Sequence, residues 1–513
     1  MSTSKYSLGS HNRMVARSAT VISLATLISR LLGFIRDMVI ARLFGVYLYA
    51  QAFVIAFRIP NLFRDFVGEG ASNAAIVPVL SEYSIKRSKE EFWELANLLL
   101  NLLLVILSAI TILGIIFSPL IVRLIAPGFI ASPDKLEATI RLNRIIFPYI
   151  LLIGLAAYAT AVLNSLKNFA VSALAPCFLN ISIIVCALLF GEGIRGLASG
   201  VLLGGLLQLA VQIPVLRRKG FKVRPVINFH HPGLEQVKRL MLPRLASSGI
   251  YQLNNFVDSV FASLITIVGD GGVAVLYFAY RLIQFPIGIF SNALSQAILP
   301  TFSTQALEKE RDELKTTLSW GIRMVFFVML PASAIFMVLA RPLVSTLFGG
   351  GRFDLNSSFL TSNALLFYSI GLCAYGGTKL LQACFFALKD TVTPAKTAFL
   401  ALVMNIVFNS ILMFPLKIGG LALATSISGI ATFLVLFFIL GKRLGGFGER
   451  KIFFSFLRIF FASLCMAFVS FLVNRALNLG WALFCAAMSY LIFCFIFGVT
   501  ELREIIRWLS LRN

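Results

Sequence analysis

Long apolar segments alternate with short polar connections along almost the whole chain of 513 residues. An α-helix needs about 20 apolar residues to cross a bilayer, and each segment is long enough for one span. The expected spans are 17–45, 48–83, 92–125, 138–166, 169–191, 194–216, 238–268, 271–302, 314–347, 357–388, 392–413, 418–441, 452–475 and 479–500. This pattern predicts an all-α polytopic membrane protein with about fourteen transmembrane helices.

The composition favours a membrane protein and excludes a soluble one. Hydrophobic residues make up 58% of the chain and charged residues only 13%, whereas about 25% charged residues are typical of soluble domains. The net charge of +23 fits basic loops that face the cytoplasm and anionic lipid headgroups. We therefore expect the bilayer, and no nucleic acid, as a partner.

Cysteine and histidine give no sign of a metal centre. The seven cysteines lie in or beside apolar segments and lack the CxxC spacing of a metal or redox site. The three histidines, His11, His230 and His231, lie in polar segments. We expect no haem, zinc or di-iron cofactor.

Lysine and arginine accumulate in alternate connections between the spans. The richer connections include 86–89, 217–239, 309–315 and 442–451, while those on the opposite side carry few charges. Because basic loops stay in the cytoplasm, this asymmetry places both termini there, as an even number of spans requires.

A weak internal repeat divides the spans. FIRDMVIA around Asp37 resembles NFVDSVFA around Asp258, and the helices that follow also match, both at an offset of about 222 residues. Chance similarity between apolar segments is the alternative. A parallel repeat is typical of transporters whose halves meet around a midplane site. We expect two pseudo-repeated six-helix lobes plus two C-terminal helices. The expected domains are an N-lobe at 1–216, a cytoplasmic linker at 217–237, a C-lobe at 238–441 and a C-terminal pair with its tail at 442–513.

Charged residues interrupt the first span, which contains Arg30, Arg36, Asp37 and Arg42. A charge at the centre of a membrane helix costs about 2.5–3.5 kcal/mol on insertion scales, so such residues mark binding sites or pathways. Arg36 lies near the middle of the span, which favours a cavity, whereas Arg42 lies near its end and can extend to the interface. Arg30 fits either a cavity or a pair with Glu69.

Further cations follow in the second span and in its repeat. Arg64 and Glu69 come after Pro60, where the helix is expected to break, and irregular backbone at membrane depth is tolerated where it lines a cavity. Arg281 occupies the matching helix of the second lobe. Because guanidinium groups bind phosphate oxygens in a bidentate manner, several arginines together suit a diphosphate.

A second group of polar residues lies in later spans. Asp258 is an intramembrane carboxylate, Asn405 and Asn409 share one helix face at i, i+4, and Thr425 lies on the next span. Their oxygen atoms suit Na⁺, and hydrogen bonds between helices are the alternative.

The segment SRLLGFIRDMVIARLFG at 29–45 is the first part of a specific resemblance to a known protein family. Together with RIPNLFRDFVGEGASNAAIVPVLSEY at 58–83, INFHHPG at 227–233 and GGRFD at 350–354, it resembles the MurJ/MviN family of lipid II flippases over essentially the whole chain. The resemblance implies two lobes around a cationic cavity and a groove for the polyprenyl tail on the helices at 452–500. It assigns the essential cavity arginines to Arg30, Arg36, Arg64 and Arg281, the acidic partner of Arg36 to Asp37, and a Na⁺ site to Asp258, Asn405, Asn409 and Thr425.

This chain departs from the family at several acidic positions. Relatives carry acids where this chain has Gln51, Tyr280, Gln284 and Asn409, so its cavity is less acidic and coupling to Na⁺ less certain. Na⁺ and the membrane potential are both candidates for the energy source.

The resemblance implies a transporter without catalytic residues in a bacterial inner membrane. It would move undecaprenyl-diphosphate-linked peptidoglycan precursor to the outer leaflet by alternating access, and proteins of cell-wall synthesis and division are candidate partners. One alternative is an exporter of a drug or of another polyprenyl-linked glycan, although a drug exporter favours an acidic, aromatic cavity. A membrane-embedded enzyme would need paired carboxylates or a histidine at the membrane surface.

Overall fold

The computed structural model describes residues 3–64, 75–191, 193–226, 228, 230–307 and 311–510. These residues form helices joined by short turns, with one isolated β-bridge between Gly350 and Phe353. They divide into two compact units, 1–260 and 261–513. The expected all-α fold is confirmed.

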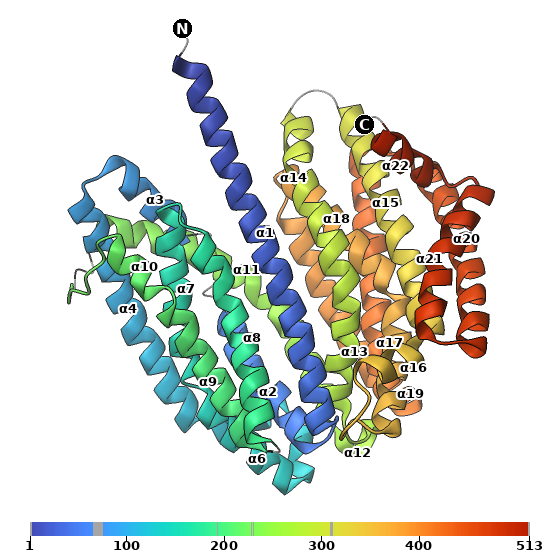
Figure 1. The fold of residues 1–513 in the computed structure, drawn as a ribbon, viewed down its shortest axis with the longest axis horizontal. Helices are drawn as coiled ribbons and strands as arrows, with labels where there is room; N and C mark the ends of the chain where they lie inside the picture. Colours follow the sequence, from blue (N-terminus) through green and yellow to red (C-terminus); the bar gives the residue numbers. More distant parts are fainter. Residues whose placement is uncertain are drawn as a thin grey trace. The chain divides into compact units, whose positions relative to one another are not determined.

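The first unit, coloured blue to green in Figure 1, contains the helices up to most of α11. Its elements are α1 (Thr3–Phe44), α2 (Leu48–Phe63), α3 (Val77–Lys86), α4 (Lys89–Ile116), α5 (Ser118–Ile125), the 3₁₀ turn η2 (Pro127–Ala131), α6 (Pro133–Ile146), α7 (Tyr149–Ser165), α8 (Ala170–Phe190), α9 (Ile194–Ala210), α10 (Ile213–Arg218) and α11 (Pro232–Ser263).

The second unit, coloured green to dark red, begins in the last turn of α11. Its further elements are α12 (Ile265–Val268), α13 (Gly272–Pro286), the π-helical turn η3 (Ile287–Ser291), α14 (Asn292–Leu307), α15 (Arg311–Val338), α16 (Ala340–Leu347), α17 (Leu355–Ile370), α18 (Leu372–Ala387), α19 (Val392–Leu444), α20 (Glu449–Ala476), α21 (Leu479–Ile496) and α22 (Thr500–Ser510).

The membrane character of the fold is confirmed, while the number of spans stays a prediction. In the described part of the chain, nine helices are long and apolar enough to cross a bilayer, or up to ten if α17 and α18, bent by 46°, form one span. The longest of these, α19, covers two predicted spans. Lys417 separates its two parts with a non-helical φ of 51°, at the connection where the sequence predicted a turn.

The two predicted repeats share a local irregularity in their second helix. In the first unit Pro60 lies inside α2, and the helix widens to π geometry at Arg64. In the second unit Pro286 ends α13, and π geometry begins at Ile287. A proline removes one backbone donor and displaces the preceding turn, and π-bulges occur often at functional sites. The same distortion therefore follows a proline in both units.

Close helix contacts in the first unit depend on small residues. A Cβ atom placed on Gly200 of α9 would lie 2.7 Å from Ile183 Cα, and one on Gly204 would lie 2.8 Å from Leu179 Cα, both in α8. Small residues let helix backbones approach where lipid supplies no hydrophobic drive for association. The α8–α9 pair therefore forms a close-packed support beside α1, which packs against α8.

Part of the predicted linker at 217–237 is bound to α4. Asn97 donates to the carbonyl of Lys222 at 3.1 Å and accepts from the backbone N–H of Arg224 at 2.8 Å. One turn further, Asn101 donates to the carbonyls of Arg224 and Val226. The predicted C-lobe, from residue 238, and the second compact unit, from residue 261, both begin inside α11. The exact domain limits stay a prediction.

Candidate functional site

Arg36 and Asp37 form a buried ion pair in α1. Arg36 is 5% exposed and Asp37 is fully buried. The Nε and Nη2 atoms of Arg36 donate to Asp37 Oδ1 at 3.0 and 2.8 Å. Neighbouring residues on a helix point about 100° apart, so helix geometry alone does not bring them together, although the family resemblance assigned Asp37 as the acidic partner of Arg36. The long arginine side chain folds back far enough to make the contact.

A third residue, Asn180 of α8, holds the other side of the guanidinium group. Arg36 Nη1 donates to Asn180 Oδ1 at 3.0 Å, and Asn180 Nδ2 donates to the carbonyl of Ser29 in α1 at 3.1 Å. The guanidinium carbon also lies 5.9 Å from the ring centre of Phe57 in α2. Contacts from three helices therefore fix the orientation of one cation at the centre of the expected span. No local pattern marks Asn180 as a site residue, because its partner is 144 residues away.

The remaining predicted arginines of the first unit differ in exposure. Arg30 is exposed in α1, as is Arg42 near the helix end, and Arg64 is half-buried at the end of α2. Glu69, the predicted partner of Arg30, lies outside the described residues.

Arg281 is the predicted arginine of the second unit and is half-buried in α13. Its Nη2 atom donates to the hydroxyl of Tyr277 at 3.3 Å, and its guanidinium carbon lies 5.5 Å from the centre of the Tyr277 ring. A cation over an aromatic face gains about 0.5–1 kcal/mol at exposed sites and more when desolvated. Tyr277 thus orients the cation without neutralising its charge.

Three of the four predicted Na⁺ ligands lie together within α19. Asn409 Nδ2 donates to Asn405 Oδ1 at 2.9 Å, and Asn405 Nδ2 donates to Thr425 Oγ1 at 3.3 Å. Asn405 and Asn409 are fully buried. Asp258 is half-buried and belongs to the first compact unit. Amide and hydroxyl oxygen atoms are of the kind Na⁺ prefers, but Asn405 Oδ1 and Thr425 Oγ1 already accept hydrogen bonds within this group, as the alternative from the sequence expected.

The sequence prediction also missed a cation within the apolar helix α18. Lys379 is half-buried in α18, within the bent pair of apolar helices. It carries the same signal as the arginines of the first span, a charge inside an apolar segment. A search of every span for charges, and not only of the repeated segments, would have found it.

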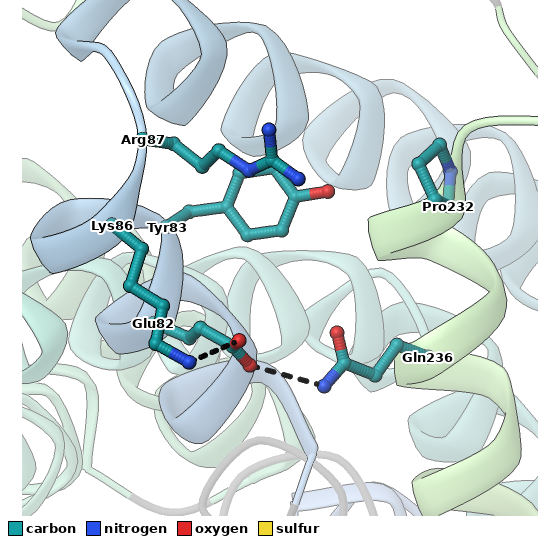
Figure 2. Close-up of a pocket in the computed structure, with 6 residues that line it drawn as sticks. All are labelled: Glu82, Tyr83, Lys86, Arg87, Pro232 and Gln236. Atoms are coloured by element: carbon teal, nitrogen blue, oxygen red, sulfur yellow. Dashed lines mark hydrogen bonds and ion pairs between the residues drawn. The ribbon is translucent and has the colours of Figure 1, made fainter.

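A polar pocket of about 310 Å³ lies between α3 and α11, and Figure 2 shows its lining. It contains none of the predicted site residues. Its two cations are matched by carboxylates, since Lys86 contacts Glu82 at 3.0 Å and Arg87 lies 3.8 Å from Glu91. Glu82 also accepts from Gln236 at 3.3 Å. The pocket is therefore a polar contact between α3 and α11.

Comparison with known proteins decides the family. The family model described as "Lipid II flippase MurJ" matches residues 40–492. A probable lipid II flippase MurJ of Buchnera aphidicola (subsp. Acyrthosiphon pisum) is 34% identical over 93% of this chain and 96% of its own length. One from Vibrio cholerae is 36% identical over 83% of each chain. The chain belongs to the family of lipid II flippases MurJ.

Solved structures agree with the MurJ assignment. A lipid II flippase MurJ in an inward closed conformation matches with a TM-score of 0.79 and 28% identity over 95% of this chain and all of that one. A MATE family multidrug resistance transporter of the MOP superfamily matches with a TM-score of 0.68 and 19% identity over 84% of this chain and 99% of that one. The second similarity shows a shared fold only. The matched family range includes Arg64 and Arg281 but begins after Arg36.

Proposed function

We propose that this MurJ chain moves lipid II across the bilayer and that Arg36 is a central contact for its diphosphate. The observation that supports this role is the buried Arg36–Asp37 pair within the first predicted span. Arginines 30, 64 and 281 complete the proposed diphosphate site, together with Glu69 as a further polar residue. The chain is a transporter of its family and not an enzyme.

Asp37 has a clear physical role in this proposal. An isolated guanidinium ion in a membrane interior is costly, and a buried partner offsets that cost before substrate arrives. A diphosphate would compete with Asp37 for Arg36 and would find the guanidinium plane already oriented by Asn180. Bidentate N–H donors match phosphate oxygens in geometry as well as charge. The site would thus replace the water lost by the diphosphate as it leaves the membrane surface.

We infer alternating access as the transport mechanism. The headgroup would bind from the cytoplasmic leaflet while the polyprenyl tail stays in lipid along the last two long helices, α20 and α21. Rocking of one lobe against the other would then expose the headgroup on the outer side. The many apolar helices make this a multi-pass membrane protein. We place it in the bacterial inner membrane with both termini cytoplasmic, because basic residues accumulate in alternate loops. Proteins of cell-wall synthesis and division remain candidate partners.

A cationic site disfavours the export of cationic drugs. A like-charged ligand would face Arg36 and Arg281, and like charges at short range repel strongly when desolvated. A polyprenyl-linked glycan other than lipid II would carry the same diphosphate, so it is the alternative that shares the chemistry of the site.

The function is tested in bacteria depleted of their own flippase. Cells that produce this chain should carry labelled lipid II in the outer leaflet, where an enzyme added outside cleaves its headgroup. Cells with an empty vector should keep the headgroup protected. Equal protection in both strains would contradict the lipid II assignment, whereas exposure of a different polyprenyl-linked glycan would support the alternative.

We propose Na⁺ coupling at Asn405, Asn409 and Thr425, with Asp258 as the charged ligand. These residues supply hard oxygen atoms, and a carboxylate would balance the charge of the ion. A Na⁺ ion would have to replace the hydrogen bonds that now join Asn409 to Asn405 and Asn405 to Thr425. Coordination would therefore require rotation of the amide groups.

Transport in reconstituted vesicles should be faster with Na⁺ than with an organic cation at the same imposed membrane potential. Asp258→Asn and Asn409→Leu should remove this difference, because each removes an oxygen ligand. Ser410→Ala, a change at a half-buried residue beside Asn409 whose hydroxyl donates to the Ile406 carbonyl, is the matched control and should keep it. Equal wild-type rates in both cations would refute Na⁺ coupling and leave the membrane potential as the candidate.

A further inference from the structure

Glu501 is a fully buried carboxylate at the start of α22. Arg323 Nη1 donates to Glu501 Oε1 at 2.5 Å, and Ser455 Oγ donates to the same oxygen at 2.8 Å. Thr500 Oγ1 donates to the other carboxylate oxygen, Oε2, at 3.2 Å. Glu504, one turn further along α22, lies 3.5 Å from Arg323 Nη2. Neither the repeat nor the predicted substrate site involves these residues.

This polar cluster, defined as Arg323, Ser455 and Glu501, joins three helices. Arg323 belongs to α15, Ser455 to α20 and Glu501 to α22. Figure 1 shows α20 and α21 beside α15, with α22 at the end of the hairpin that they form. The chain turns into α22 at Gly498, whose φ of 64° favours glycine, and Arg458 donates to the Gly498 carbonyl at 3.1 Å. The short helix is therefore held back against the hairpin.

Along the rest of its length, the hairpin contacts α15 and α16 mainly through apolar side chains. The rings of Phe326 and Phe456 lie 5.3 Å apart, and Leu343 of α16 packs in one cluster with Ala482 of α21. The hydroxyl of Tyr490 adds one polar contact, donating to the Phe327 carbonyl at 2.6 Å. In a bilayer, apolar surfaces gain little by leaving lipid, so hydrogen bonds and close packing decide how such helices align. The polar cluster is therefore one of the contacts that determine the hairpin's position.

A buried ion pair adds specificity more than stability. Replacing such a pair by apolar residues is often neutral, whereas removing one partner leaves an uncompensated charge. The cluster has the features of a contact that sets how the helices align along one another, because its geometry holds only when α15, α20 and α22 are correctly aligned. An apolar contact would tolerate sliding of one helix along another.

We propose that Arg323, Ser455 and Glu501 position the α20–α21 hairpin for the polyprenyl tail of the substrate. The proposal rests on the proposed function, in which the tail lies along this hairpin. The three residues are positioning residues: they touch one another and fix the helices that would line the tail. A displaced hairpin would weaken transport of long-tailed substrates and leave headgroup recognition intact.

The test compares transport of lipid II with that of an analogue carrying a short polyprenyl tail. The wild-type chain should prefer the long tail. Glu501→Gln should lower transport of the long-tailed substrate by about tenfold, the factor expected when a charge-assisted hydrogen bond is lost, and should leave the short-tailed analogue unchanged. Exchange of the charges in Arg323→Glu with Glu501→Arg should restore part of the preference, because it re-forms the ion pair with its charges reversed.

Ser455→Ala is a milder variant that keeps the ion pair, and it should weaken the preference in the same direction. Ser463→Ala is its matched control. Ser463 is buried two turns further along α20, and its hydroxyl has no hydrogen-bond partner in the described part of the chain, so the preference should not change.

The outcomes separate the two proposals. If the wild-type chain prefers the long tail and Glu501→Gln either keeps that preference or slows both substrates equally, the positioning role is refuted and the proposed function stands. If the wild-type chain transports both substrates equally, the tail does not lie on the hairpin, and that part of the proposed function fails together with the positioning role.

Discussion

Arg36→Ala is expected to abolish the growth of a flippase-depleted bacterium that depends on this chain, although the protein still reaches the membrane. The substitution removes the guanidinium group that Asp37 and Asn180 hold at 2.8–3.0 Å. Each charge-assisted hydrogen bond to a phosphate contributes about 1.5–3 kcal/mol. Loss of two such bonds would lower transport by more than about a hundredfold. Growth on depletion and the amount of chain in the membrane are the two measurements.

Instability must be separated from loss of substrate contact in this variant. Removing Arg36 leaves Asp37 buried without its counterion, which costs about 3–5 kcal/mol. The double variant Arg36→Ala with Asp37→Asn removes that charge and should recover thermal stability without recovering growth. Arg36→Lys keeps the charge but loses the planar fork that contacts both partners, and it should transport poorly.

Arg42→Ala is the matched control on the same helix. Arg42 is exposed and lies near the end of α1, so its loss should leave growth unchanged. Normal growth of the Arg36→Ala strain would show that Arg36 does not bind the diphosphate and that its pair with Asp37 is purely structural.

The sequence predicted the helices well, because these depend on local properties. Apolar length predicted the helical class and Lys417 marked the turn inside α19, whereas α2 continues through Pro60 to Phe63 and does not break there. The importance of Arg36 also followed locally, since a charge within an apolar segment is costly wherever the chain folds. Such signals need no knowledge of distant contacts.

Contacts between distant segments could not be predicted from the sequence. Asn180 contacts Arg36 from another helix, and Glu501 contacts Arg323 from 178 residues away. An asparagine or a glutamate near a helix end has many solvated or locally bonded states, so its type alone does not predict a buried partner. The pairing of the adjacent Arg36 and Asp37 followed from the family resemblance and not from helix geometry, because neighbouring residues on a helix point about 100° apart.

Arg281→Ala is expected to abolish the same growth, and it tests the contribution of the second compact unit. Arg281 is half-buried and rests over the Tyr277 ring at 5.5 Å. Arg281 is the cation that the second unit would contribute to the proposed site, so its loss would leave part of the diphosphate charge without a partner. Transport should fall by at least about tenfold, the loss of one charge-assisted hydrogen bond. The measurements are growth on depletion and the rate of lipid II transport in vesicles.

Tyr277→Phe tests the contribution of the Tyr277 hydroxyl group separately from that of the Arg281 cation. This variant keeps the aromatic face below Arg281 and removes the hydroxyl that accepts from Nη2 at 3.3 Å. Losing one hydrogen bond to a neutral acceptor costs about 1 kcal/mol, so transport should fall by no more than about fivefold. Arg281→Lys keeps a positive charge over the ring and should fall between the two. If Arg281→Ala transports as well as Tyr277→Phe, the second unit does not supply a diphosphate contact at this position, and the proposed site would have to lie within the first unit alone.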